Sequence, residues 1–143
     1  MEMKILGALK YEVTIASSRM FSIRYLRAAH AVQLTRWTTA YIIERMLQEY
    51  SMLQFLPSLI AASAVYIALK SSQKRSGWSA TLQYYTQYDA AALQPCLAEM
   101  ESIFKGKTTL STVKKKYSSM KYGGVATNVQ LVFDIDEAVI APE

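Results

Sequence analysis

Few side chains of this 143-residue chain could carry out acid–base or nucleophilic chemistry, and they are scattered along it. His30 is the only histidine and Cys96 the only cysteine. Cysteine-dependent catalysis needs a base beside the thiol, so a Cys96/His30 pair requires the fold to bring the two together. A single histidine without carboxylate or cysteine neighbours favours neither a zinc site nor a catalytic triad. Glu99 and Glu101 are two residues apart in a predicted helix and therefore diverge.

Phosphate-binding loops are also missing from the sequence. It contains neither the P-loop motif nor the glycine pattern of dinucleotide-binding proteins, and the pair Gly123-Gly124 is too short to cradle a phosphate. Cys96 lies on an apolar helical stripe, where a cysteine serves as a small core side chain. We therefore expect a protein that is not an enzyme, with no catalytic residue, no metal site and no cofactor.

The basic residues are the remaining candidates for chemistry. Net charge is +5, and residues 1–133 carry all 16 basic but only seven of the 11 acidic side chains. The run Lys114–Lys116 could hold phosphates, with Tyr117 and Tyr122 available to stack on bases. A solvated helix face is the simpler interpretation of such a run. Nucleic-acid binding therefore stays an alternative that we do not favour.

The element that must organise the fold is the apolar stretch Phe55–Leu69. Pro57 suits the first turn of a helix, where no backbone N–H is needed. A helix that is hydrophobic on nearly every face must be covered on all sides by other elements or by lipid. The stretch is shorter than the roughly 20 residues that cross a bilayer, so it indicates a buried central helix rather than a membrane segment.

Helical periodicity surrounds this stretch on both sides. We predict helices over 1–13, 20–31 and 35–50. In the helix over 20–31, the residues predicted to face inward are Phe21, Ile23, Leu26 and Ala29. Ser22 interrupts this apolar face, and Arg19, Arg24 and Arg27 are predicted to be exposed. In the helix over 35–50, the residues predicted to face inward are Trp37, Ala40, Ile43, Leu47 and Tyr50, whereas Arg36, Glu44, Arg45 and Gln48 face water.

The pattern after the central stretch is also helical. A polar break at 73–77 leads to an aromatic segment, 78–88, and Asp89 can cap the next helix. Pro95 argues against a straight helix through that point. A regular stripe follows it, and Thr108 or Thr109 opens a last short helix with Leu110, Val113 and Tyr117. The alternation of Val129, Leu131, Phe133 and Ile135 predicts an extended arm without a partner strand.

Several motifs in order resemble the carboxy-terminal repeat of a cyclin of the mitotic A/B kind. They are the stretch Glu49–Ala68, then Trp78, Tyr85-Thr86-Gln87-Tyr88, Leu93, Pro95-Cys96-Leu97 and Lys116–Val125. Residues 1–13 resemble the last helix of the family's amino-terminal repeat and 14–19 the linker between repeats. The resemblance places the carboxy-terminal cyclin domain at 20–122 and leaves a tail at 123–143. This chain departs from the family at Ala16, Arg45, Gln48 and Gln87.

The resemblance implies an all-α fold, a five-helix cyclin-like bundle around a central hydrophobic helix with an extra N-terminal helix. It implies a regulatory subunit that binds and activates a cyclin-dependent protein kinase in cell-cycle control, located in nucleus and cytoplasm. The kinase-binding positions carried over are Glu2, Leu6 and Tyr11. We expect no membrane association, and self-association through residues 1–13 is a further expectation. Cyclin-like folds also resemble general transcription factors. The alternative function is therefore a basic helical module that associates with nucleic acid.

Overall fold

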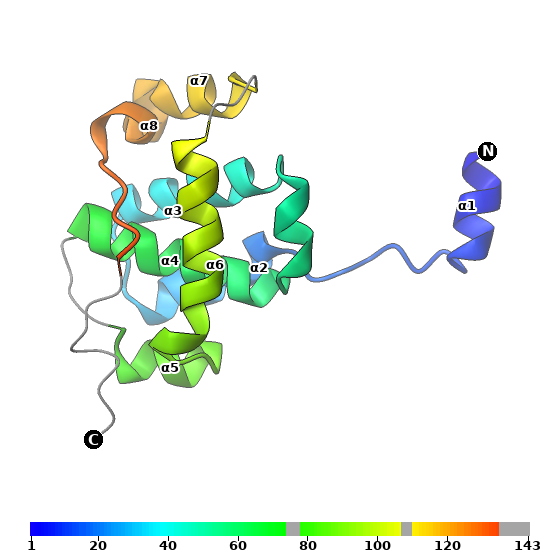
Figure 1. The fold of residues 1–143 in the computed structure, drawn as a ribbon, viewed down its shortest axis with the longest axis horizontal. Coiled ribbons are helices and arrows are strands. Elements are labelled where there is room, and N and C mark those ends of the chain that lie inside the picture. Colours follow the sequence, from blue (N-terminus) through cyan, green and yellow to red (C-terminus); the bar gives the residue numbers. More distant parts are fainter. Residues whose placement is uncertain (74–77, 107–109, 135–143) are drawn as a thin grey trace.

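The central apolar stretch forms helix α4, Pro57–Gln73, and the other helices of the bundle are arranged around it (Figure 1). The computed structural model describes residues 1–73, 78–106 and 110–134. These residues form helices and connecting loops and no strand, which confirms the predicted all-α class. The other elements are α1 (Glu2–Ala8), α2 (Ser18–Ala28), α3 (Gln33–Met46), η1 (Tyr50–Gln54), α5 (Ala80–Thr86), α6 (Ala90–Lys105), α7 (Thr112–Ser118), η2 (Met120–Tyr122) and α8 (Val125–Asn128).

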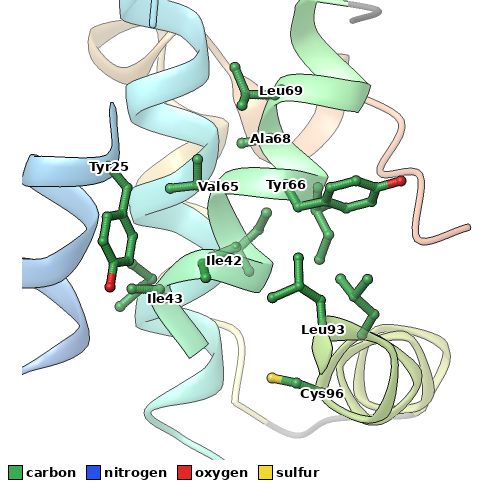
Figure 2. Close-up of a cluster of buried hydrophobic side chains, with 14 of the residues drawn as sticks. Tyr25, Ile42, Ile43, Val65, Tyr66, Ala68, Leu69, Leu93 and Cys96 are labelled. Atoms are coloured by element: carbon green, nitrogen blue, oxygen red, sulfur yellow. The ribbon is translucent and has the colours of Figure 1, made fainter. Parts of the chain in front are cut away.

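Helix α4 is buried on every side. All nine residues from 61 to 69 are buried, and seven of them, among them Val65 and Ile67, expose 0% of their surface. Helices α2, α3 and α6 pack directly on α4. Figure 2 shows the converging side chains, Tyr25 from α2, Ile42 and Ile43 from α3, and Leu93 and Cys96 from α6. The predicted buried central helix is therefore confirmed.

Polar side chains fix where the shorter helices begin. The Asp89 carboxylate accepts a hydrogen bond from the backbone N–H of Ala92 at 2.7 Å, so the predicted cap of α6 is confirmed. Helix α6 then runs through Pro95 without interruption to Lys105. Ser79 caps α5 in the same way, accepting from the N–H of Leu82. Helix α5 packs on α2 and so completes the five-helix bundle α2–α6.

The predicted inward faces of α2 and α3 are partly wrong. In α2, Ile23 is exposed, whereas Ser22 and Tyr25 are buried; the Ser22 hydroxyl donates to the carbonyl of Arg19, which makes its burial tolerable. Helix α3 ends at Met46 instead of residue 50. Because the chain leaves the helix there, Leu47 and Tyr50 are exposed rather than inward-facing.

Arg45 was predicted to face water, but its side chain lies inside, and the residue exposes only 5% of its surface. It forms an ion pair with Glu49, one helical turn later, and this pairing offsets the cost of burying its charge. Nearby, Oε1 of Gln48 is buried and has no hydrogen-bond partner within the described part of the chain. Both residues depart from the apolar pattern of the family, and both replace apolar packing by polar groups.

The last helices close over α3. The hydroxyl of buried Tyr117 donates to Glu44 Oε1 at 2.7 Å, and Lys116 Nζ lies 2.8 Å from the same carboxylate. Burial alone would raise the pKa of Glu44, but these two hydrogen bonds hold it below its ordinary value. Burial and the bond to Glu44 raise the pKa of Tyr117. Helix α7 begins at Thr112, after Leu110; Thr108 and Thr109 lie outside the described residues.

A glycine allows the turn between η2 and α8 to lie against α3. Gly123 has a φ of +67°, and a Cβ at this position would lie 2.9 Å from a ring carbon of Trp37. Any other residue would meet both backbone strain and a clash with the indole. The half-buried Trp37 ring thus packs directly on the backbone of the turn, which belongs to the predicted tail 123–143.

Residues 129–134 have no helix and lie along the bundle, as expected for an extended arm (Figure 1). Leu131 and Phe133 pack against the main core. The Tyr66 hydroxyl and Lys70 Nζ both donate to the Asp134 carbonyl, at 3.2 and 2.5 Å. Ile135, the last residue of the predicted alternation, lies outside the described residues. Part of the predicted tail is therefore packed on the domain; the limits 20–122 themselves stay a prediction.

Helix α1 stands apart from the bundle, joined to it by residues 12–17 (Figure 1). The predicted helix over 1–13 ends early because Lys10 and Tyr11 adopt positive φ values of 50° and 59°. No residue of α1 is buried. The chain thus has a packed bundle and one helix that does not contribute to its core.

The first prediction concerns the buried ion pair of Arg45. Removing Glu49 leaves the buried Arg45 charge uncompensated, whereas replacing Arg45 by an apolar side chain leaves only the Glu49 carboxylate, which is partly exposed to water. We expect Glu49→Ala to lower the free energy of unfolding by about 1–3 kcal/mol, since Glu49 is itself partly exposed. Arg45→Met should change it by less than about 1 kcal/mol. Urea unfolding measures both, and a larger loss for Arg45→Met than for Glu49→Ala would contradict this assignment.

The second prediction concerns the thiol of Cys96, which is fully buried. Burial raises its pKa to about 11, so the thiolate fraction at pH 8 is on the order of one part in a thousand. We expect Ellman's reagent at pH 8 to leave the folded chain unlabelled and to label one thiol per chain after urea denaturation. Stoichiometric labelling of the folded chain within minutes would show an accessible, reactive thiol and revive the cysteine-enzyme hypothesis.

Candidate partner-binding helix

Helix α1 and the turn that follows it carry the three residues predicted to contact a partner. Glu2 opens the helix, where a carboxylate also interacts favourably with the helix dipole. Leu6 lies one turn later on the same face, since residues four apart are neighbours on a helix. Tyr11 lies beyond the helix, but its backbone N–H donates to the Leu6 carbonyl at 2.9 Å. This bond turns the chain back, so that all three residues belong to one short structural unit.

The unit exposes much apolar surface. Glu2 and Tyr11 are exposed, and Leu6 is half-buried. Further exposed apolar side chains belong to the same segment of the chain, namely Met3, Ile5, Leu9 and Val13. The sequence prediction missed Met3 as a contact candidate, because helical periodicity marks apolar positions as core and gives no sign that a helix lacks a core to join. Clustered exposed apolar side chains are typical of protein–protein contact surfaces.

The residues considered for catalysis are not brought together. Cys96 is buried on α6 against α4, whereas His30 is exposed just after the end of α2, with a φ of 49°. Within residues 1–73, 78–106 and 110–134, no three His, Cys, Asp or Glu side chains gather as metal ligands would. The same part of the chain contains no helix with the length and apolar character needed to span a bilayer.

The lysine run of α7 lacks the aromatic platform that nucleic-acid stacking requires. Tyr117 is buried and bonded to Glu44, so its ring is not available to a base. Tyr122 is half-buried, and its ring centroid lies 5.0 Å from that of Tyr117. Lys116 is paired with Glu44, which leaves Lys114 and Lys115 as exposed lysines of the run. This arrangement favours the solvated-face interpretation.

Comparison with known proteins agrees with the predicted family. The family model described as the C-terminal domain of cyclin matches residues 17–131. Cyclin-A1-1 of Arabidopsis thaliana is 39% identical over 134 residues, which cover 88% of this chain and 29% of that protein. G2/mitotic-specific cyclin-B of Dictyostelium discoideum is 35% identical over 129 residues, 88% of this chain and 30% of the relative.

The chain thus spans less than a third of the length of these relatives. Cyclin-A1-4 of Oryza sativa subsp. japonica, 37% identical over 136 residues, is covered over 38% of its length. Similarity to both A-type and B-type proteins agrees with the helices packed around α4, and the matched residues 17–131 begin just before α2 and reach the extended arm. The chain belongs to the cyclin family, and residues 17–131 are its cyclin C-terminal domain.

Proposed function

We propose that this cyclin chain binds and activates a cyclin-dependent protein kinase in cell-cycle control, as a regulatory subunit that catalyses no reaction itself. Membership of the cyclin family supports the role. The kinase supplies the phosphoryl-transfer chemistry, and a regulatory subunit acts by holding the kinase C-helix and activation loop in place. The predicted location in nucleus and cytoplasm stays a prediction.

The observation that carries this proposal is the exposed helix α1. A seven-residue helix is marginally stable by itself in water, so a partner surface that covers its apolar side chains would stabilise it. In the proposed complex, the Glu2 carboxylate accepts a charge-assisted hydrogen bond from the kinase. Leu6 and Tyr11 supply apolar contact area, and a tyrosine is a frequent centre of binding energy in interfaces.

Two alternatives to a kinase partner are less well supported, namely a second copy of this chain and a nucleic acid. A second copy could bury the same apolar face through residues 1–13, in which case binding of the kinase and self-association would compete. The nucleic-acid alternative came from the basic body of the chain, from the likeness to general transcription factors and from the lysine run of α7. In that run, Tyr117 is buried and Tyr122 is half-buried, which leaves little aromatic surface for stacking. The three relatives named above are A-type or B-type cyclins, which favours the kinase partner.

The third prediction tests the role of Leu6. Placing a charge at this position removes the burial of one leucine, which is worth about 1.5–3 kcal/mol, so Leu6→Asp should weaken kinase binding at least tenfold. Ile15→Asp is the matched control, because Ile15 is an exposed apolar residue of the linker outside the proposed contact. We expect the control to change affinity by less than about twofold. Biolayer interferometry on an immobilised cyclin-dependent kinase measures both.

Light scattering at the same concentrations measures the molar mass of the chain alone, so that self-association is detected separately from kinase binding. Phosphorylation of a peptide substrate by the kinase, with and without the chain, measures activation independently of binding. Equal affinity of the wild-type chain and Leu6→Asp would contradict the proposed contact. Failure of the wild-type chain to bind the kinase at all would contradict the proposed function.

A further inference from the structure

A second surface of the domain combines positive charge with exposed apolar side chains. It is an open groove of about 590 Å³ between α2 and α5, here called the basic groove. Its lining includes Met20, Ile23, Arg24, Arg27, His30 and Tyr85. Helix α1 lies away from the bundle, at the other end of the linker (Figure 1).

The charge of the groove is not neutralised from within. Arg24 and Arg27 come from successive turns of α2, and His30 follows the end of that helix. Among the described residues, no Asp or Glu lines the groove. Neither arginine forms an ion pair with the described part of the chain. The Arg24 guanidinium carbon lies 5.6 Å from the centroid of the Tyr85 ring, a cation–π contact that orients the guanidinium without cancelling its charge.

The same groove exposes an apolar strip. Met20 exposes 64% of its surface, Ile23 41% and Tyr85 40%. Ile23 was expected inside but is exposed, because Ser22 and Tyr25 take the inward positions of α2. Methionine and tyrosine beside arginine are the side chains enriched in protein–protein contacts, where lysine is depleted. Met20, Ile23 and the two arginines lie on α2, and Tyr85 of α5 lies against Arg24. All five line one groove, so they can contact one bound segment.

We propose that the basic groove binds an acidic peptide segment of a partner protein that carries an apolar residue between its carboxylates. Its carboxylates pair with Arg24 and Arg27, whose planar guanidinium groups match carboxylate geometry. Its apolar side chain packs on Met20 and Ile23. Nucleic acid suits the groove less well, because a strand needs a track of cations and aromatic platforms rather than two arginines beside aliphatic side chains. This surface is separate from α1 and does not depend on the proposed kinase contact.

The fourth prediction uses a defined probe, the fluorescein-labelled peptide Gly-Glu-Asp-Leu-Asp-Glu-Phe-Gly, and fluorescence anisotropy with the full chain. Its amide counterpart, with Gln and Asn in place of Glu and Asp, tests charge. We expect the acidic peptide to bind and the amide peptide to bind at least tenfold more weakly, since an amide cannot form the charge-assisted hydrogen bonds that a carboxylate forms with a guanidinium group. Raising the salt concentration should weaken binding of the acidic peptide through screening.

Two charge-matched variants locate the site. Arg24→Glu/Arg27→Glu should weaken binding at least tenfold, whereas Lys114→Glu/Lys115→Glu, with the same change of net charge on exposed α7, should change it less than about threefold. Ile23→Ser keeps every charge and should still weaken binding severalfold. Circular dichroism checks that each variant keeps its helix content. All four substituted side chains of the charge variants are exposed, so we expect folded proteins.

Each other outcome overturns the proposal. Absence of binding by the wild-type chain up to 1 mM peptide, or equal binding of the acidic and amide peptides, would do so. Equal losses in the two charge variants would show an effect of net charge alone. An unchanged affinity in Ile23→Ser would remove the apolar contact. Tighter binding of a dT12 oligonucleotide that is lost in Arg24→Glu/Arg27→Glu would assign the groove to nucleic acid instead.

Discussion

Burial of α4 on all sides is the constraint on which the rest of the structure depends. Such a helix needs neighbours around its whole circumference, and it obtains them from α2, α3 and α6 and from residues 129–134 of the arm. Small residues such as Ala61 and Ala64 allow those neighbours to approach closely. The surrounding helices bury their apolar faces against α4. Their outer faces face solvent and can therefore carry charged residues or contact other molecules.

This arrangement explains why two surfaces remain open. The bundle is closed without α1, so the apolar side chains of α1 have no place in its core and are presented to solvent. The basic groove forms where α5 packs on α2 at the outside of the bundle. The bundle thereby fixes the basic groove between α2 and α5, whereas α1 is joined to the bundle only by the linker. One of these surfaces thus belongs to the cyclin domain and the other to the segment that precedes it.

Sequence patterns predicted the elements whose environment is uniform. The apolar run Phe55–Leu69 predicted α4, and Asp89 before an apolar stripe predicted a cap. Patterns failed where a distant or unexpected partner decides burial. Arg45 lies inside because Glu49 neutralises it, and Tyr117 because Glu44, far earlier in the chain, accepts its hydroxyl. The basic groove was not foreseen, because Tyr85 reaches α2 only through the fold. The contact residues of α1 came from family resemblance, since periodicity describes cores and not partner surfaces.

The most direct test of the account is amide hydrogen exchange of the folded chain, followed by mass spectrometry at low and high protein concentration. The amides of residues 61–69 should exchange only through global unfolding, and those of residues 2–8 at nearly unprotected rates in the dilute sample. Protection of residues 2–8 that grows with concentration would indicate self-association. Rapid exchange within residues 61–69, or strong protection of residues 2–8 in a proven monomer, would contradict a core closed around α4 with α1 outside it.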